Sequence, residues 1–410
     1  MPQPLASSAL RERFGSPATW VFVREHADDD VHALLLRKNV PPEVDLRFAA
    51  QQVEGRQKAR AKLPLLAANP SFIFPAKLGM EQCSSESAAR YKAQLFAGKA
   101  IADVTGGLGV DALYAARRAK SVCYVEKSEA LCELAQHNFS ALGLTNIEVR
   151  CGDGIQLLQH TSRRFDAIYL DPSRRDGNRN SHALLADCEP NVLPHQDFLL
   201  SRAEMVVLKA SPMLDVAQAL RELRHVCEAH VVAVKNDCKE LLLVCRQGKA
   251  EPLIRCVNIH AGRTQTFDFT LPEERAAAVR YAENLRRYLY EPNVTLLKAG
   301  ALKLPCLRFG VEKLHPDTHL YTSDVLLPEF PGRAFEVHDV FAPGSRAFKS
   351  QMAGSSASVT VRNFPLTVAE IRKKYGVKDG GSAYLFAATL RNGERRIIKT
   401  TKVQQFCGQE

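Results

Sequence analysis

The 410-residue sequence lacks the patterns typical of membrane and secreted proteins. Its longest apolar stretches, such as Leu241 to Cys245, are strand-sized, whereas a membrane helix needs about 20 apolar residues. Residues 1–20 have neither the basic start nor the continuous apolar core of a secretory signal. We therefore expect a cytoplasmic protein that does not associate with membranes.

Cysteine is present but follows no recognisable pattern. The eleven cysteines are scattered singly, without a C-x-x-C pair and without Cys and His at zinc-ligand spacing. This pattern indicates reduced thiols and predicts no structural metal. With 46% hydrophobic and 24% charged residues, the chain has the composition of a globular protein, and its length predicts two to four domains.

The predicted elements divide the chain into four parts. Residues 1–95 have a helical pattern, and residues 96–248 alternate strands with helices. Residues 249–330 and 331–410 are predicted to be two small α+β units. Inside the last unit, Thr367 to Glu370 form a capping box that opens a helix closing at Gly376, and a hairpin is expected around residues 391–393.

The alternating pattern of residues 96–248 predicts an α/β fold with a mostly parallel sheet. Strands separated by helices give parallel sheets covered on both faces. The last two strands are joined by only six residues, too few for a crossover helix, so we expect an antiparallel strand there. The predicted strands are residues 100–104, 122–126, 147–150, 167–170, 205–209, 231–234 and 241–245.

A glycine-rich turn, Asp103 to Gly109, follows the first of these strands. Such a turn lets the backbone approach a ligand closely and leaves N–H groups of the next helix available. The carboxylate of Asp103 would repel a pyrophosphate, but it suits the cationic S-adenosylmethionine (SAM). The residues expected to contact this cofactor are Asp103, Thr105, Gly106, Gly107 and Gly109. The alternative for Asp103 is a local cap of the turn.

Acidic residues also follow the next strands. Glu126 ends the second strand, 23 residues after Asp103, where a carboxylate can accept both ribose hydroxyls. Asp153 and Gly154 follow the third strand, where an acid can accept from the adenine amino group. Lys127, next to Glu126, is included among the candidate cofactor contacts. The alternatives are an ion pair between Glu126 and Lys127 and a helix cap at Asp153, and Asp111 is interpreted as a favourable acid in a first helical turn.

The segment after the fourth strand is expected to lie where the methyl group meets its acceptor. Asp171, Pro172 and Ser173 partly match the Asp/Asn-Pro-Pro-aromatic motif of enzymes that methylate exocyclic amines, and they are the candidate catalytic residues. Arg174 stands in place of the aromatic residue. With Arg175, it is a candidate contact to a base or phosphate, the alternative being a mobile basic loop. No cysteine stands where carbon methylation would need one, so transfer to nitrogen is favoured.

The positive charge concentrates near the C-terminus. Residues 331–410 contain 13 Lys and Arg and 6 Asp and Glu, a balance of +7 out of +10 for the whole chain. A local basic excess favours a polyanionic partner. Arg372, Lys373 and Lys374 are the candidate contacts.

Several segments resemble a bacterial family of class I SAM-dependent methyltransferases with a ferredoxin-like insert and a C-terminal THUMP-like domain. These segments are Glu81 to Glu86, Asp103 to Asp111, Asp171 to Arg175, Leu208 to Asp215, Tyr290 to Asn293, Asn363 to Leu366 and Lys378 to Gly381. The resemblance implies a Rossmann-like sheet and SAM as the cofactor. Because THUMP domains are associated with RNA binding, chiefly tRNA, it also implies an RNA partner.

The stretch Ser84 to Ala89 is also similar to the lead-in of guanine-N2 cap methyltransferases. That similarity implies that Ser85 and Glu86 cover the cofactor, the alternative being an ordinary helix cap.

These features predict a SAM-dependent RNA N-methyltransferase, with guanine weakly favoured. A methyltransferase for a protein or small molecule and a non-catalytic RNA-binding module that retains SAM are the alternatives. The sequence indicates neither the modified position nor the oligomeric state.

Overall fold

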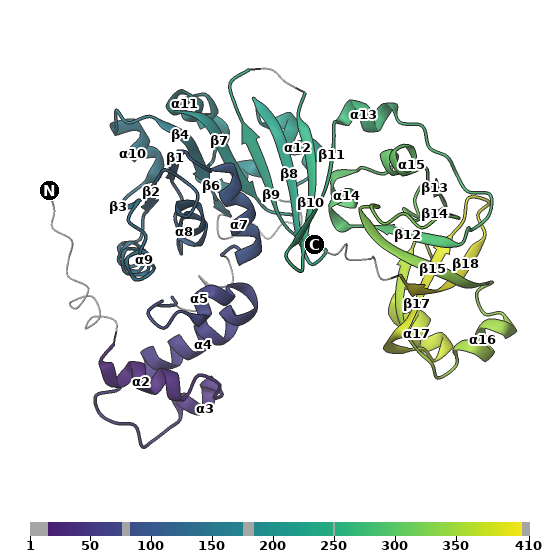
Figure 1. Ribbon diagram of the computed structural model, residues 1–410, viewed down its shortest axis with the longest axis horizontal. Helices are drawn as coiled ribbons and strands as arrows, with labels where there is room; N and C mark the ends of the chain where they lie inside the picture. Colours follow the sequence, from purple (N-terminus) through teal and green to yellow (C-terminus); the bar gives the residue numbers. More distant parts are fainter. Residues whose placement is uncertain (1–14, 76–82, 175–183, 249–250, 404–410) are drawn as a thin grey trace. The chain divides into compact units, whose positions relative to one another are not determined.

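The computed structural model describes residues 15–75, 83–174, 184–248 and 251–403. The chain divides into two compact units, and Figure 1 shows their elements. The first unit consists of residues 1–227 and 239–250, and the second of residues 228–238 and 251–410.

The first unit begins with the predicted helical region. Its helices are α2 (Pro17–Glu25), α3 (Val31–Leu35), α4 (Leu46–Lys62), α5 (Pro64–Ala68) and α7 (Glu86–Leu95). Ser16, Asp30, Asp45 and Ser85 cap α2, α3, α4 and α7 by accepting a hydrogen bond from a first-turn amide. The helices α2, α3 and α4 pack through a small apolar cluster of Phe22, Val23, Leu34, Ala49 and Val53.

The main sheet of the first unit has the predicted mostly parallel topology. Its strands are β1 (Ala100–Asp103), β2 (Ser121–Glu126), β3 (Ile147–Cys151), β4 (Phe165–Leu170), β7 (Ala203–Ala210) and β9 (Asp237–Cys245). They lie in the order β9-β7-β4-β1-β2-β3, with parallel pairs except for β9, which is antiparallel to β7. The chain order reverses between β1 and β4, which is where parallel α/β sheets bind ligands at their carboxyl edge.

Helices cover both faces of this sheet, as predicted. They are α7, α8 (Val110–Ala116), α9 (Glu129–Ala141), α10 (Gly154–His160), α11 (Gln196–Arg202) and α12 (Val216–Glu222). Side chains of α7, α8 and α9 share one apolar core with alternate residues of the strands, such as Ile101, Tyr124 and Tyr169. Because successive strand residues point to opposite faces, the remaining apolar residues face the side where α10 and α11 lie (Figure 1).

A small ribbon lies beyond β4. It consists of β5 (Ser173–Arg174) and β6 (Cys188–Glu189), which pair antiparallel. Two short 3-10 turns, η1 (Leu185–Asp187) and η2 (Leu193–His195), flank β6 and lead to α11.

The second unit contains two sets of strands. Most of β8 (Val226–Val234) pairs parallel with β10 (Leu253–His260), which pairs antiparallel with β11 (Arg263–Phe269). A seven-stranded sheet has the order β13-β14-β12-β15-β18-β17-β16. Its strands are β12 (Tyr288–Pro292), β13 (Glu312–Lys313), β14 (Tyr321–Ser323), β15 (Gly332–Phe341), β16 (Ser356–Arg362), β17 (Lys378–Thr389) and β18 (Arg395–Lys402).

The helices of the second unit are α13 (Leu271–Ala276), α14 (Val294–Ala299), α15 (Leu304–Phe309), α16 (Arg346–Met352) and α17 (Val368–Tyr375). The capping box of Thr367 and Glu370 and the closing Gly376 are present at the ends of α17, and β17 and β18 form the expected hairpin. The seven-stranded sheet continues across residue 330, between β12 and β15. The division into four parts stays a prediction.

Candidate active site

The predicted site residues of the first unit gather at one edge of the sheet. Asp103 ends β1 and Glu126 ends β2, while Asp153 and Asp171 follow β3 and β4 directly. Since β1 to β4 are parallel neighbours, their carboxyl ends lie side by side. Sequence spacing alone predicted this juxtaposition.

The loop from Asp103 to Gly109 is anchored to both neighbouring strands. The amide of Val104 donates to the carbonyl of Tyr169 at 3.1 Å, and the amide of Gly106 donates to the carbonyl of Val125 at 2.8 Å. The hydroxyl of Tyr124 donates to the carbonyl of Gly107 at 2.5 Å. These hydrogen bonds fix the conformation of the loop through contacts within the protein itself.

The three glycines of the loop differ in what surrounds them. A Cβ on Gly106 would lie 2.2 Å from the Tyr124 ring, so packing already requires glycine there. Gly109 has φ +79, and its Cβ would lie 2.8 Å from Phe139. At Gly107, with φ +54, the nearest atom would be the Thr105 carbonyl oxygen at 3.9 Å. Gly107 therefore faces open space, which a ligand can enter.

Asp103 is a buried acid with few local partners. Asp103 is only 2% exposed, and the Thr105 amide donates to its Oδ1 at 3.2 Å. Burial raises the pKa of Asp103 well above its usual range, and the nearby acids Asp111, Asp171 and Glu126 add to this effect. The hydrogen bond from the Thr105 amide lowers the pKa of Asp103, but by less than burial raises it. A cation beside Asp103 would relieve this concentration of negative charge.

Glu126 and Lys127 do not pair with each other as one alternative proposed. Glu126 Oε2 accepts from the Gly107 amide at 2.8 Å, and Oε1 accepts from the Ser128 amide at 2.9 Å. Each carboxylate oxygen can accept a further bond, so ribose hydroxyls remain acceptable partners. Glu126 is thereby attached to the loop from Asp103 to Gly109.

Asp153 makes the contacts expected of a structural cap. Its Oδ1 accepts from the Gln156 amide at 3.0 Å, and its Oδ2 lies 2.9 Å from Lys127 Nζ. A Cβ on Gly154 would lie 2.3 Å from the Val104 carbonyl oxygen, so this glycine permits α10 to begin close to the loop. A role toward adenine for Asp153, and cofactor contacts for Gly154 and Lys127, stay predictions.

Asp171 is held by the loop and by a lysine. Its amide donates to Thr105 Oγ1 at 2.6 Å, which links Asp171 to the loop from Asp103 to Gly109. Its Oδ2 forms an ion pair with Lys209 Nζ, while the Asp171 side chain remains 35% exposed. Pro172 is half-buried, and Ser173 is exposed in β5. Thr105 and Lys209 thus fix Asp171 with part of its carboxylate open to solvent.

Arg174, a predicted substrate contact, follows Ser173 in β5. The backbone of Arg174 pairs with Cys188 in the β5–β6 ribbon. Arg175 lies outside the described residues.

Ser85 and Glu86 occupy structural positions at the start of α7. Ser85 Oγ accepts from the Ala88 amide at 3.4 Å as the N-cap. Glu86 accepts from the Leu65 amide at 3.1 Å and from Arg90 Nε at 3.0 Å, connecting α7 with α5. Their contact with a cofactor stays a prediction.

Lys209 and Asp111 lie near the candidate site and were not assigned to it from the sequence. Asp111 lies in the first turn of α8, as interpreted, and it also accepts hydrogen bonds from Tyr169 and Ser84 at 2.7 and 2.9 Å. Lys209 is a charged residue inside the apolar strand β7. That pattern was the available signal, because a lysine seldom lies in a core strand without a partner.

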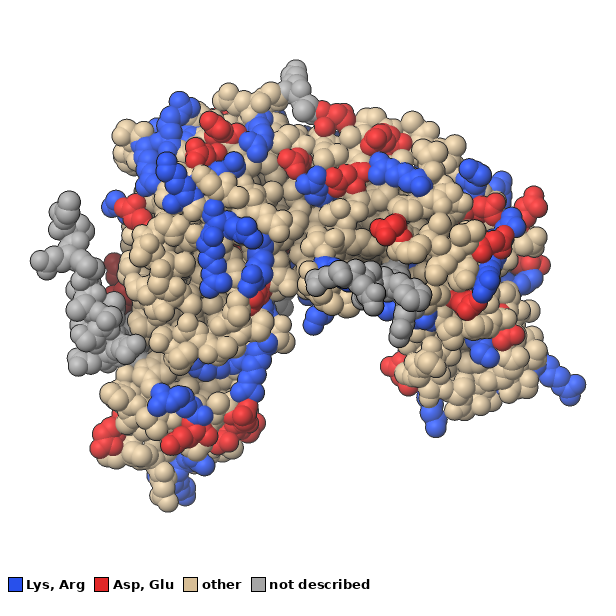
Figure 2. Space-filling view, viewed as in Figure 1, with Lys and Arg blue, Asp and Glu red and all other residues tan. Residues whose placement is uncertain are grey.

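The predicted basic contacts of the second unit lie in the last turn of α17. Arg372 forms an ion pair with Asp379, whereas Lys373 and Lys374 are exposed. Lys374 Nζ lies 5.6 Å from the centre of the Tyr375 ring. On the face shown in Figure 2, basic side chains are interspersed with acidic ones.

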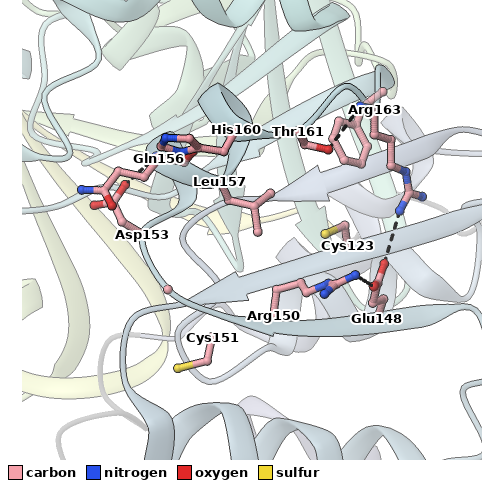
Figure 3. Close-up of a pocket in the computed structure, with 12 residues that line it drawn as sticks. Cys123, Glu148, Arg150, Cys151, Asp153, Gln156, Leu157, His160, Thr161 and Arg163 are labelled. Carbon is pink, nitrogen blue, oxygen red and sulfur yellow. Dashed lines mark hydrogen bonds and ion pairs between the residues drawn. The ribbon is translucent and has the colours of Figure 1, made fainter. Parts of the chain in front are cut away.

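A cavity of about 450 Å³ lies beside β3 and α10 in the first unit (Figure 3). Figure 3 shows Glu148 with Arg150 and Arg163 on one side, and Asp153 and His160 on the other. None of its lining residues belongs to the loop from Asp103 to Gly109. The cavity therefore touches the predicted adenine end of the site only through Asp153 and its neighbours.

The remaining expected absences concern metals, disulfides and membranes. In the described ranges, no group of three or more His, Cys, Asp or Glu is arranged to hold a metal ion. No disulfide joins cysteines of those ranges. None of the helices in the described part of the chain has the length and apolar character needed to cross a bilayer.

Comparison with known proteins gives matches to three family models. Residues 90–230 match the model described as conserved hypothetical protein 95. Residues 288–331 match a ferredoxin-like domain, and residues 332–402 match a THUMP domain-like model.

Two relatives match over most of their length. A candidate methyltransferase from Porphyromonas gingivalis W83, known from a crystal structure, is 32% identical with a TM-score of 0.84, covering 96% of this chain and 99% of that one. An uncharacterised SAM-dependent methyltransferase of Mycobacterium tuberculosis H37Rv is 24% identical over 353 residues, covering 84% of this chain and 93% of the relative.

Proposed function

Because this chain belongs to the class I SAM-dependent methyltransferases that carry a ferredoxin-like and a THUMP-like domain, we propose that it methylates a base nitrogen in RNA. The family accounts for the reaction type and the cofactor. The acceptor atom and the RNA substrate are our proposal, with a guanine amine as the favoured acceptor.

The residues at the sheet edge fit the cofactor. Gly107 leaves an opening in the loop that any side chain would narrow, and the Asp103 carboxyl lies buried among other acids. SAM carries both an ammonium and a sulfonium group, and its sulfonium supplies the methyl group. In our proposal Asp103 binds the ammonium, Glu126 the ribose hydroxyls and Asp153 the adenine amine.

The position of Asp171 is the observation that carries transfer to nitrogen. Lys209 forms an ion pair with its carboxylate, and Thr105 accepts a hydrogen bond from its backbone amide. The Asp171 side chain is nevertheless 35% exposed. A carboxylate so placed can accept an N–H of an exocyclic amine and direct the nitrogen lone pair. Pro172 and Ser173 extend the same surface, with the backbone carbonyl of Pro172 as a second acceptor. Such positioning needs no strong base.

The second unit supports RNA as the substrate. Residues 332–402 match a THUMP-like domain, and the last 80 residues carry a charge of +7. Lys373 and Lys374 are exposed at the end of α17, where ammonium groups can contact phosphates. Arg174 and Arg175 are the proposed contacts near the acceptor base, and Arg372 adds to the basic helix end.

The test is methyl transfer from tritiated SAM to total bacterial RNA by the full-length protein. We expect labelled RNA, with the label in an N-methylated nucleoside after digestion. For Asp171→Ala we expect SAM affinity to be retained and transfer to fall about a hundredfold, since an acceptor displaced by about 1 Å reacts that much more slowly. Asp28→Ala, which removes a surface acid paired with Arg60, is the control and should transfer normally.

Other outcomes would contradict the proposal. Full transfer by Asp171→Ala would remove Asp171 from the mechanism. Label in protein or small molecules only would identify a different substrate class. SAM binding without any transfer would favour a non-catalytic RNA-binding module.

A further inference from the structure

A buried ionic cluster lies behind the candidate acceptor site in the first unit. Lys92 of α7 is 1% exposed and its Nζ lies 2.6 Å from Oε2 of Glu240 in β9, which is 2% exposed. The same ammonium donates to Ser84 Oγ at 2.8 Å and lies 3.2 Å from Asp111 Oδ1. Three elements distant in the chain therefore place opposite charges in contact within the core.

Asp111 connects this cluster to the strand that leads to Asp171. Its Oδ2 accepts from the hydroxyl of Tyr169 at 2.7 Å and from Ser84 Oγ at 2.9 Å. Tyr169 lies in β4, two residues before Asp171. The ionic cluster is thus hydrogen-bonded to the end of β4 through Asp111 and Tyr169.

Lys209 pairs with the carboxylate of Asp171 and is influenced by the charges of the cluster. Its side chain is 12% exposed and forms an ion pair with Asp171 Oδ2. Burial alone would lower the pKa of Lys209, but the negative charges of Asp171, Asp111 and Glu240 outweigh burial and raise it. Lys209 therefore stays protonated and cannot act as a proton acceptor in the reaction.

Stability alone does not explain this arrangement. Removing several charges from water is unfavourable, and an apolar core of similar volume is often at least as stable as a buried ion pair. The side chains of Asp111 and Lys209 are each 12% exposed, and that of Asp171, at 35%, is the most exposed of these charged groups. In the described ranges no hydrogen bond reaches Asp171 Oδ1, so that oxygen is available to a substrate.

We propose that Lys209 is a positioning residue for methyl transfer, which holds one oxygen of Asp171 so that the other faces the acceptor amine. The negative charges of Asp111 and Glu240 favour the ammonium form of Lys209, and Lys92 forms ion pairs with both of these acids. The inference rests on the proposed function, because it acts through Asp171. It adds Lys209 as a residue on which the rate of transfer depends although it does not touch the substrate.

The experiment compares Lys209→Met and Lys209→Arg in the full-length protein with tritiated SAM and total bacterial RNA. For Lys209→Met we expect kcat to fall by about ten- to a hundredfold. The KM for RNA and the affinity for SAM, measured by calorimetry, should remain within about threefold, because a positioning residue does not bind either substrate. Lys209→Arg should recover most of kcat, since a guanidinium also pairs with a carboxylate. Lys120→Met, an exposed substitution on the same unit, is the control.

A double-variant cycle with Asp171→Ala separates positioning from a structural role. If Lys209 acts through Asp171, adding Lys209→Met to Asp171→Ala should not lower kcat further. Additive losses, or unchanged kcat in a folded Lys209→Met protein, would overturn the inference. If Lys209→Met does not fold, Lys209→Gln carries the same test.

The parallel measurement on Asp171→Ala distinguishes two failures. Full activity of Asp171→Ala would reject the proposed role of Asp171 and this inference with it. Loss of activity in Asp171→Ala with normal kcat in Lys209→Met would reject only the role of Lys209.

Discussion

At the residue scale, Asp103 combines burial with a surplus of negative neighbours. Its pKa is raised chiefly by burial and further by Asp111, Asp171 and Glu126. In the ligand-free protein, the carboxyl therefore remains protonated to a higher pH than an exposed aspartate would. A cationic ligand favours the ionised form, so binding below the raised pKa releases a proton.

We predict that the affinity for SAM increases with pH because of Asp103. The increase should approach about tenfold per pH unit below the raised pKa of the free protein and level off above it. Calorimetry between about pH 5 and 9, in buffers of different ionisation enthalpy, measures both the affinity and the released proton. Asp103→Asn should bind more weakly and lose this component, while any titration of SAM itself remains in both proteins. Equal pH slopes for the two proteins would contradict the prediction.

At the element scale, the loop between β1 and α8 is anchored by its own backbone. Gly106 and Gly109 are required by the rings of Tyr124 and Phe139, so their identity carries information about packing. Gly107 faces open space with φ +54, and it is the glycine of the loop whose substitution probes the ligand. Packing therefore explains Gly106 and Gly109, while a ligand contact at Gly107 stays a prediction.

We predict that Gly107→Ala impairs SAM binding more than its effect on stability explains. Gly143, after α9, has φ +68 and no atom within 4 Å of an added Cβ, so Gly143→Ala is a matched control. Both variants should lower the free energy of unfolding by about 1–2 kcal/mol, because alanine is strained at positive φ. Urea unfolding measures this cost, and calorimetry should show weaker SAM binding only for Gly107→Ala. Equal SAM affinity in the two variants would remove Gly107 from the cofactor contact.

At the scale of the whole molecule, the proposed chemistry and the proposed RNA contacts belong to different units. The cofactor loop and Asp171 lie in the first unit, and α17 lies in the second. RNA affinity and methyl transfer should therefore respond separately to substitutions in each unit. Salt dependence is the direct measure, because phosphate contacts release counterions.

We predict that reversing Lys373 and Lys374 to Glu weakens binding of total bacterial tRNA and lowers its salt dependence. The slope of log K against log salt should decrease by about 0.7–0.9 for each lost phosphate contact. Filter binding at several salt concentrations measures it, and SAM affinity should not change. Lys38→Glu with Lys120→Glu makes the same charge change on the first unit and serves as the control. An equal decrease in both double variants would indicate nonspecific attraction.

The sequence alone predicted the α/β fold and the placement of the acidic residues at one edge of the sheet. Strand and helix periodicity, the cap of Thr367 and Glu370, and the short connection before β9 are signals carried by residues close together in the chain. Because parallel strands share a carboxyl edge, local signals were sufficient to bring Asp103, Glu126 and Asp171 together. Strand β10 and the continuous sheet across residue 330 were not predicted, since pairing partners depend on distant segments.

Only the tertiary structure decided what surrounds these residues. The contact between Lys92 and Glu240 joins residues 148 positions apart, and that between Lys209 and Asp171 joins residues 38 positions apart. No local pattern specifies such pairs, because a buried charge is stabilised by whichever opposite charge the fold brings to it. The sequence by itself therefore determined the fold class and the sheet edge at which Asp103, Glu126 and Asp171 gather. The folded chain decided that Asp171 is held by Lys209, because that contact exists only after β4 and β7 have paired.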